Sequence, residues 1–137
     1  MSVRFLRLLV VGLLLPLPLS AHHGGAAYDV GNPVTLKGTV TQWYYSNPHC
    51  LLTLDVKGED GMVVTWIAET QGPSIMFPAG YRRDSFKPGD QVTVIVDPAK
   101  NGRPVGHIRE AVTAAGWTLG GGGQSIPKPP AGKEGQP

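Results

Sequence analysis

Residues 33–118 consist mainly of short stretches in which large apolar and polar side chains alternate. A period of two places successive side chains on opposite faces of an extended chain, so the pattern indicates half-buried β-strands rather than helices. Turn sequences such as Asn47-Pro48 and Asp60-Gly61 separate the stretches. We expect strands at residues 33–46, 50–57, 62–69, 91–97 and 104–118.

The order of these elements predicts the fold. An apolar connector bracketed by prolines, residues 72–80, separates the third and fourth strands and is expected to hold one short helical turn. Three meandering strands, a helical turn and a hairpin form the order of an OB-fold, a small, partly open five-stranded barrel. We therefore predict an all-β, OB-fold-like barrel, with a five-stranded open sandwich as the alternative. Its interior is expected to include Leu36, Val40, Leu52, Leu54, Ile67, Val92 and Val94.

The first 21 residues have the layout of a secretory signal peptide. Arg4 and Arg7 precede an apolar run at residues 8–19, and Ser20-Ala21 supplies small side chains at the cleavage site. The run is shorter than the roughly 20 residues that a membrane helix needs. We expect a periplasmic or secreted protein with no membrane span after cleavage. Cleavage after Ala21 makes His22 the first residue; cleavage after Ser20 is the alternative.

The sequence divides into three regions: a signal peptide at 1–21, a β-barrel domain at 22–119 and a Gly/Pro-rich tail at 120–137. The tail contains one large apolar residue, Ile126. Such a segment cannot bury enough apolar surface to offset the entropy lost on ordering, so we expect it to be disordered.

The charge and the cysteine content limit the classes of function and of cross-link that this protein can have. The chain has 12 Lys and Arg against 10 Asp and Glu, and Arg4 and Arg7 account for the excess. The processed protein is thus near neutral, and without a basic patch we expect no binding to nucleic acid. Cys50 is the single cysteine, which excludes an internal disulfide. We expect its thiol to be buried; a metal thiolate and an intermolecular disulfide are the alternatives.

Two adjacent histidines, His22 and His23, begin the processed chain. A free α-amine and neighbouring imidazoles can chelate one metal ion, and nitrogen ligands in tetragonal geometry suit Cu(II), followed by Ni(II) or Zn(II). His49 follows the Asn47-Pro48 turn and is the candidate third ligand. Its other ring nitrogen would then need a fixed partner, such as Asp29 or a backbone carbonyl. The alternatives are a solvated N-terminus and a structural His49, and His107 is expected to be a surface histidine.

Trp43 and Tyr45 lie two residues apart on the first strand and therefore share a face. Exposed aromatic side chains on OB-fold strands stack on bases or sugars, so this pair is a candidate ligand platform. The alternative is that both rings pack in the core, with Trp66 as the neighbour of Trp43.

The sequence contains no evident nucleophile–base pair and no paired carboxylates of the kind that hydrolysis requires. We therefore predict a protein that binds a ligand and is not an enzyme. The leading function is binding of a small ligand or a metal, copper or zinc. One alternative is an accessory module that binds another periplasmic protein through its barrel face, and the other is a metal-dependent enzyme.

Several segments together resemble a known family: His22–Gly24, Tyr28-Asp29, Pro33–Thr41, Asn47–His49, Leu54–Lys57 and Arg83–Val94. In this order, over residues 21–118, the chain is similar to a family of secreted bacterial proteins known as domain of unknown function 6152. Members typically have His-His-Ser where this chain has His22-His23-Gly24. The resemblance implies export and a small β-domain, and it implies no known activity.

Overall fold

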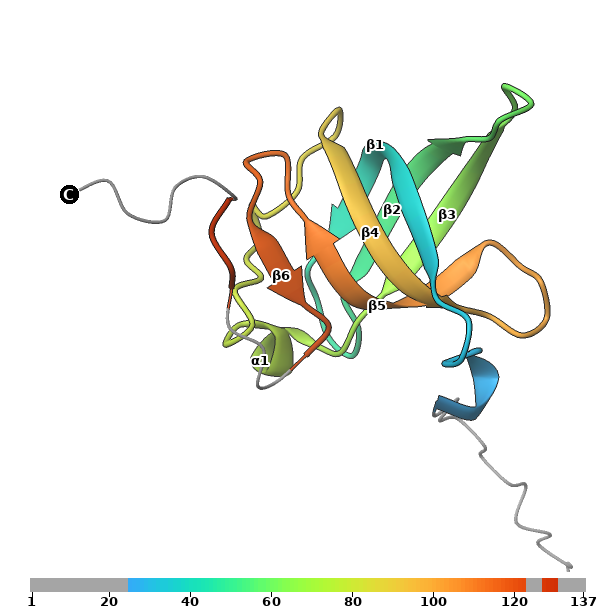
Figure 1. The fold of residues 1–137 in the computed structure, drawn as a ribbon. Coiled ribbons are helices and arrows are strands. Elements are labelled where there is room, and N and C mark those ends of the chain that lie inside the picture. Colours follow the sequence, from blue (N-terminus) through green and yellow to red (C-terminus); the bar gives the residue numbers. More distant parts are fainter. Residues whose placement is uncertain (1–24, 123–126, 131–137) are drawn as a thin grey trace, which may run out of the picture.

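The computed structural model describes residues 25–122 and 127–130 (Figure 1). The expected signal peptide, His22 and His23 lie outside these residues. A 3-10 turn η1 (Gly25–Ala27) precedes the first strand, and no helix of the described residues is long and apolar enough to cross a membrane. The remaining elements are β1 (Val34–Tyr44), β2 (Leu51–Lys57), β3 (Val63–Glu69), α1 (Pro73–Met76), β4 (Gln91–Pro98), β5 (Val105–Val112) and β6 (Thr118–Gly120).

The strands form one sheet in the order β3-β2-β1-β4-β5-β6 (Figure 1). Neighbouring strands in this order are antiparallel, and β3 also pairs in parallel with β5, through Ile67–Glu69 and Val105–His107. This last pairing closes β1 to β5 into a barrel, and α1 lies between β3 and β4 in the chain. The predicted OB-fold-like barrel is confirmed, and the open sandwich is excluded.

The interior of the barrel matches the predicted set except at one position. Leu36, Val40, Leu52, Leu54, Val92 and Val94 are all buried, whereas Ile67 keeps 39% of its surface exposed. On β3 it is Ala68 that is fully buried, opposite Leu52, with Trp66 also packed against the core. The prediction for Ile67 is wrong because five of the seven residues of β3 are apolar and they occupy both faces of the strand. Alternation then does not define which face is inside.

The segment predicted as one fifth strand, residues 104–118, contains two strands, β5 and the start of β6. β5 ends at Val112, and the chain turns before β6, with the amide of Gly116 bonded to the carbonyl of Thr113 at 2.8 Å. Gly116 has a φ of +85°, a left-handed conformation that suits glycine and interrupts the strand. The apolar and β-branched run at residues 111–115 conceals this break, because no turn residue appears before Gly116.

The sequence predicts a disordered tail from residue 120, and the structure differs at residues 127–130. Thr118 and Lys128 exchange two backbone hydrogen bonds of 2.9 and 2.8 Å. Pro127 packs so closely on Gly80 that a Cβ at that glycine would collide with the proline ring. Prolines lose little conformational entropy on ordering, so this short segment can dock without a large apolar surface.

Candidate functional site

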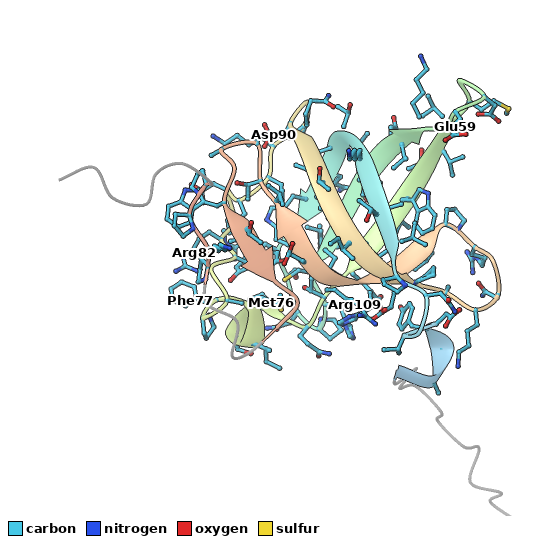
Figure 2. All side chains as sticks on the ribbon, viewed as in Figure 1. Glu59, Met76, Phe77, Arg82, Asp90 and Arg109 are labelled. Atoms are coloured by element: carbon cyan, nitrogen blue, oxygen red, sulfur yellow. The ribbon has the colours of Figure 1, made fainter. Side chains whose placement is uncertain are left out.

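Residues Ala27–Val30 form a strap that fixes the start of the described chain to the barrel. The amide of Asp29 donates to the carbonyl of Pro98 at 2.8 Å, and the amide of Lys100 donates to the carbonyl of Ala27 at 3.0 Å. Arg109 donates from Nη2 to the carbonyl of Val30. The strap therefore lies along the β4–β5 end of the barrel (Figure 1), and Figure 2 shows Arg109 near it.

An ion pair supports the strap from beneath. Arg109 Nε lies 2.6 Å from Asp97 Oδ1, and Asp97 keeps only 8% of its surface exposed. A nearly buried carboxylate is costly unless it is paired and hydrogen-bonded. The pairing therefore neutralises Asp97 and orients the Arg109 guanidinium toward Val30.

The side chain of Tyr28, which belongs to the strap, meets two side chains of the barrel: Glu69 and His107. The hydroxyl of Tyr28 donates a hydrogen bond to Oε1 of Glu69, and its ring centroid lies 5.9 Å from that of His107. Glu69 and His107 are also direct partners in the parallel β3–β5 register. We call this group the Tyr28–Glu69–His107 cluster. It combines a carboxylate, an imidazole and a phenol on the outer surface of the barrel.

The pKa of the Tyr28 hydroxyl is raised well above its ordinary value. Burial contributes most, followed by the hydrogen bond to Glu69 and by the negative charge of that carboxylate. The phenol therefore stays protonated at neutral and moderately alkaline pH, and it remains a donor to Glu69. Tyr28 acts here as an anchor for the chain.

A cavity of about 270 Å³ opens beside the cluster. Its walls combine charged and apolar groups from the strap, β3 and the β4–β5 loop. The lining residues are Ala27, Tyr28, Glu69, Ala99, Asn101, Arg103 and Val105. Glu69 and Arg103 are the two charged residues of this lining, so the cavity combines opposite charges with apolar walls.

His49 lies in the β1–β2 loop, exposed to solvent. Its Nδ1 is 2.8 Å from the carbonyl oxygen of Thr70, a distance that fits an Nδ1–H donor. In that tautomer Nε2 is the nitrogen left for a ligand, and Thr70 supplies the fixed backbone partner expected for a metal-binding histidine. The same bond also fits a purely structural role, so a metal role for His49 stays a prediction.

Cys50, next to His49, is fully buried and forms no disulfide. Burial is the main cause that raises the pKa of its thiol. A protonated, enclosed thiol is a poor metal ligand at neutral pH. This arrangement agrees with the expected buried cysteine.

Within the described residues, no three His, Cys, Asp or Glu side chains lie close enough to hold a metal ion. A metal site of three such ligands would therefore need a ligand from outside the described part of the chain, where His22, His23 and Glu134 lie. The sequence predicts a surface position for His107 and does not single out Glu69. The signal that could have found them is the OB-fold order itself, because the third and fifth strands of that fold are neighbours.

Comparison with known proteins supports the resemblance. Residues 13–109 match the model of a family of unknown function, DUF6152. The chain belongs to this family. No curated protein and no solved structure matches it. The match to DUF6152 spans the strap, His49 and the Tyr28–Glu69–His107 cluster.

The candidate platform of Trp43 and Tyr45 is packed within the chain. Trp43 donates from Nε1 to the carbonyl of Arg82 at 2.8 Å, and the Phe86 ring meets it edge-on at 5.0 Å. Tyr45 and Tyr81 lie within about 6 Å of the same indole. Both Trp43 and Tyr45 are partly buried against the core. Their role as a stacking platform stays a prediction, now confined to the exposed parts of the rings.

A second and larger cavity, of about 510 Å³, lies on the α1 side of the barrel. One wall is the indole of Trp117, which is 45% exposed. Arg82 is held there by its own contacts: it donates to the carbonyl of Phe77 at 2.7 Å and stacks over that ring at 3.6 Å (Figure 2). The lining residues are Gly80, Arg82, Asp84, Ser85, Thr113, Ala115, Trp117, Leu119 and Pro127.

Proposed function

We propose that this chain is an exported metal-binding protein that holds Cu(II), or Zn(II), through the α-amine, His22 and His23. In this proposal a signal peptide is removed after Ala21, and the free amine and the first imidazole form a chelate. The protein binds its metal without catalysing a reaction, and it uses the barrel as a rigid support.

The observation that supports the proposal is the anchoring of Tyr28 to Glu69. A fully extended chain spans at most about 3.6 Å per residue, so six residues reach about 22 Å. His22 and His23 therefore stay within about that distance of a fixed point on the barrel. An N-terminal chelate on this tether therefore stays within reach of the outer surface of the barrel around Tyr28 and Glu69.

The ligand chemistry favours copper. Cu(II) takes nitrogen ligands in tetragonal geometry and binds most nitrogen sites more tightly than the other first-row divalent ions. The amine, His22 and His23 offer three nitrogens, and His49 is the fourth nitrogen suggested by the sequence. Because the amine and the imidazoles must lose their protons to bind, affinity should fall as the pH drops through about 8, where the amine is protonated, and further through about 6.5, where the imidazoles are protonated.

Titration of the processed protein with Cu(II) tests the proposal, once mass spectrometry has established the N-terminal residue. We expect one site tighter than about 1 μM at pH 7.5, which is a routine affinity for a multidentate site. The matched control has an acetylated N-terminus, which removes the α-amine as a ligand. This control and the double variant His22→Ala/His23→Ala should both bind at least about tenfold more weakly. Parent-like binding by both would overturn the proposal.

A second candidate is binding of another exported protein by the outer face of β3. Met62, Val63, Val64 and Ile67 keep between 39% and 68% of their surface exposed around this strand. Exposed apolar side chains that gather in one place often mark a protein contact. Protein binding becomes the preferred function if the processed protein does not bind copper, if it captures a periplasmic partner, and if the Val63→Asp variant no longer captures that partner.

A further inference from the structure

We propose that the outer edge of β6, together with Gly80, Gly116 and Trp117, is a recognition site for an extended proline-rich segment of another protein. The chain's own segment Pro127–Pro130 occupies this site in the structure, and a partner segment of the same chemistry competes with it. The inference is independent of the metal proposal. It also concerns a different surface from the outer face of β3, because β3 and β6 lie at opposite ends of the strand order.

The backbone of the Pro127–Pro130 segment pairs with the edge of β6, beside which it runs in Figure 1. Thr118 and Lys128 bond to each other through both amides and both carbonyls, at 2.9 and 2.8 Å. Pro127 and Pro129 flank Lys128, and in an extended chain the backbone groups of such neighbours point away from the partner strand. Proline has no amide hydrogen, so it fits these two positions without the loss of a hydrogen bond. The edge therefore suits a Pro-x-Pro sequence.

Two glycines of the barrel make room for two of the prolines. A Cβ at Gly80 would collide with the ring of Pro127, and a Cβ at Gly116 would lie 3.1 Å from Cβ of Pro130. The φ angles of these glycines are +94° and +85°, which other residues rarely adopt, so the turns keep both positions free of a side chain. The two hollows therefore accept prolines that are three residues apart.

The indole of Trp117 extends the site beyond the prolines. It is 45% exposed and forms a wall of the 510 Å³ cavity, which of residues 127–130 only Pro127 lines. Thr113 fixes the backbone of Trp117, since its amide donates to the Trp117 carbonyl at 2.9 Å and its Oγ1 accepts from the Trp117 amide at 3.1 Å. Proline-rich segments dock in grooves lined by aromatic side chains. A fixed, exposed indole beside bound prolines matches that mode of recognition.

The chemistry of the tail favours a different protein over a second copy as the partner. A second copy would replace the docked segment by an identical one and would gain no contact. The sequence from Pro127 to Pro137 contains no aromatic and no large aliphatic residue with which to cover Trp117. A different protein that carries such a side chain next to its prolines gains this contact. It needs the gain, because a short linker holds the chain's own segment at an effective concentration on the order of 1 mM.

The experiment titrates isotope-labelled full-length chains with a synthetic peptide that reproduces residues 125–132, Ser-Ile-Pro-Lys-Pro-Pro-Ala-Gly, and follows the amide resonances of residues 116–118. Lys128→Pro removes the amide that donates to Thr118 and so releases the chain's own segment. Lys128→Ala keeps that amide and is the matched control. We expect the peptide to bind Lys128→Pro at least about tenfold more tightly than it binds the parent or Lys128→Ala. A segment docked about nine-tenths of the time leaves only about one-tenth of the sites free, which accounts for this factor.

A control peptide with proline in place of its lysine cannot donate to Thr118, so we expect it to leave all three chains unchanged. If the double variant Pro127→Gly/Pro130→Gly is needed because Lys128→Pro does not fold, the same results are expected of it.

Three results would overturn the inference. The first is a Lys128→Pro chain whose resonances at residues 116–118 do not respond to the peptide, which would make the docked segment only a cover for the edge of β6. The second is equal binding of the peptide to all three chains, or equal binding of the two peptides, because neither would involve the edge that Lys128 occupies. The third is a parent that dimerises while Lys128→Pro stays monomeric, which would assign the site to the tail of a second copy.

Discussion

Tyr28 and Glu69 lie 41 residues apart in the chain and are joined by a hydrogen bond from the phenol to the carboxylate. The bond connects the segment before β1 to the end of β3, the strand whose parallel pairing with β5 closes the barrel. On either side of Tyr28, Asp29 forms a backbone hydrogen bond to the end of β4, and Ala27 forms one to the β4–β5 loop. Residues 27–30 are therefore part of the folded domain.

Replacing Tyr28 with Phe should weaken this attachment. The variant removes one hydrogen bond to a charged group that is partly exposed, so we expect a loss of about 1 kcal/mol in the free energy of unfolding. Urea denaturation measures the loss, and faster amide exchange at residues 27–30 should accompany it. The matched control is Tyr44→Phe, because Tyr44 is 54% exposed on β1. Equal losses in the two variants would contradict a specific role for the Tyr28 hydroxyl.

Two truncations on neighbouring strands test the assignment of the barrel's inside and outside. Leu54 on β2 is fully buried, so Leu54→Ala should cost about 2–5 kcal/mol of unfolding free energy, as in other emptied core sites. Ile67 on β3 is 39% exposed, so Ile67→Ala should cost less than about 1.5 kcal/mol. Chemical denaturation of both variants gives the comparison. An Ile67→Ala variant as unstable as Leu54→Ala would place Ile67 inside after all.

The order of strands was predictable from the sequence because it depends on local signals. Alternation and turn residues define β1, β2 and β4 within a few positions. Trp43 shows where such signals fail. The register of β1 against β2 shifts between Val40 and Gln42, which is a bulge. The extra residue reverses the faces, so Trp43 turns inward although it continues the outward series of Lys37 and Thr39.

The candidate site was predictable only in part. His22, His23 and His49 stand out because of their sequence neighbours. The pairing of Glu69 with His107 depends on the closure of the barrel by β3 and β5, which no local pattern encodes. Tyr28 adds a further contact with Glu69, 41 residues away in the chain. Side chains brought together by long-range strand pairing need the fold before they can be recognised as a group.

The last prediction concerns alkaline pH and rests on Tyr81. This side chain is fully buried, and burial raises the pKa of its hydroxyl, with smaller contributions from Cys50 and Glu110. Below the ordinary tyrosine pKa of about 10, both the folded and the unfolded state keep the proton, and the pH has no effect through this group. Above it, the unfolded chain loses the proton while the folded protein retains it.

Stability should therefore fall as the pH rises past about 10, by about 1.4 kcal/mol per pH unit for this one group. Tyr81→Phe removes the titrating proton and, with it, only a weak hydrogen bond of 3.5 Å to the carbonyl of Leu119. The variant should thus be close to the parent at pH 8 and more stable than the parent at pH 11. Urea denaturation of both proteins at pH 8, 9, 10 and 11 measures the difference. Parallel curves across this range would show that the Tyr81 hydroxyl titrates alike in the folded and unfolded chains, contrary to its burial.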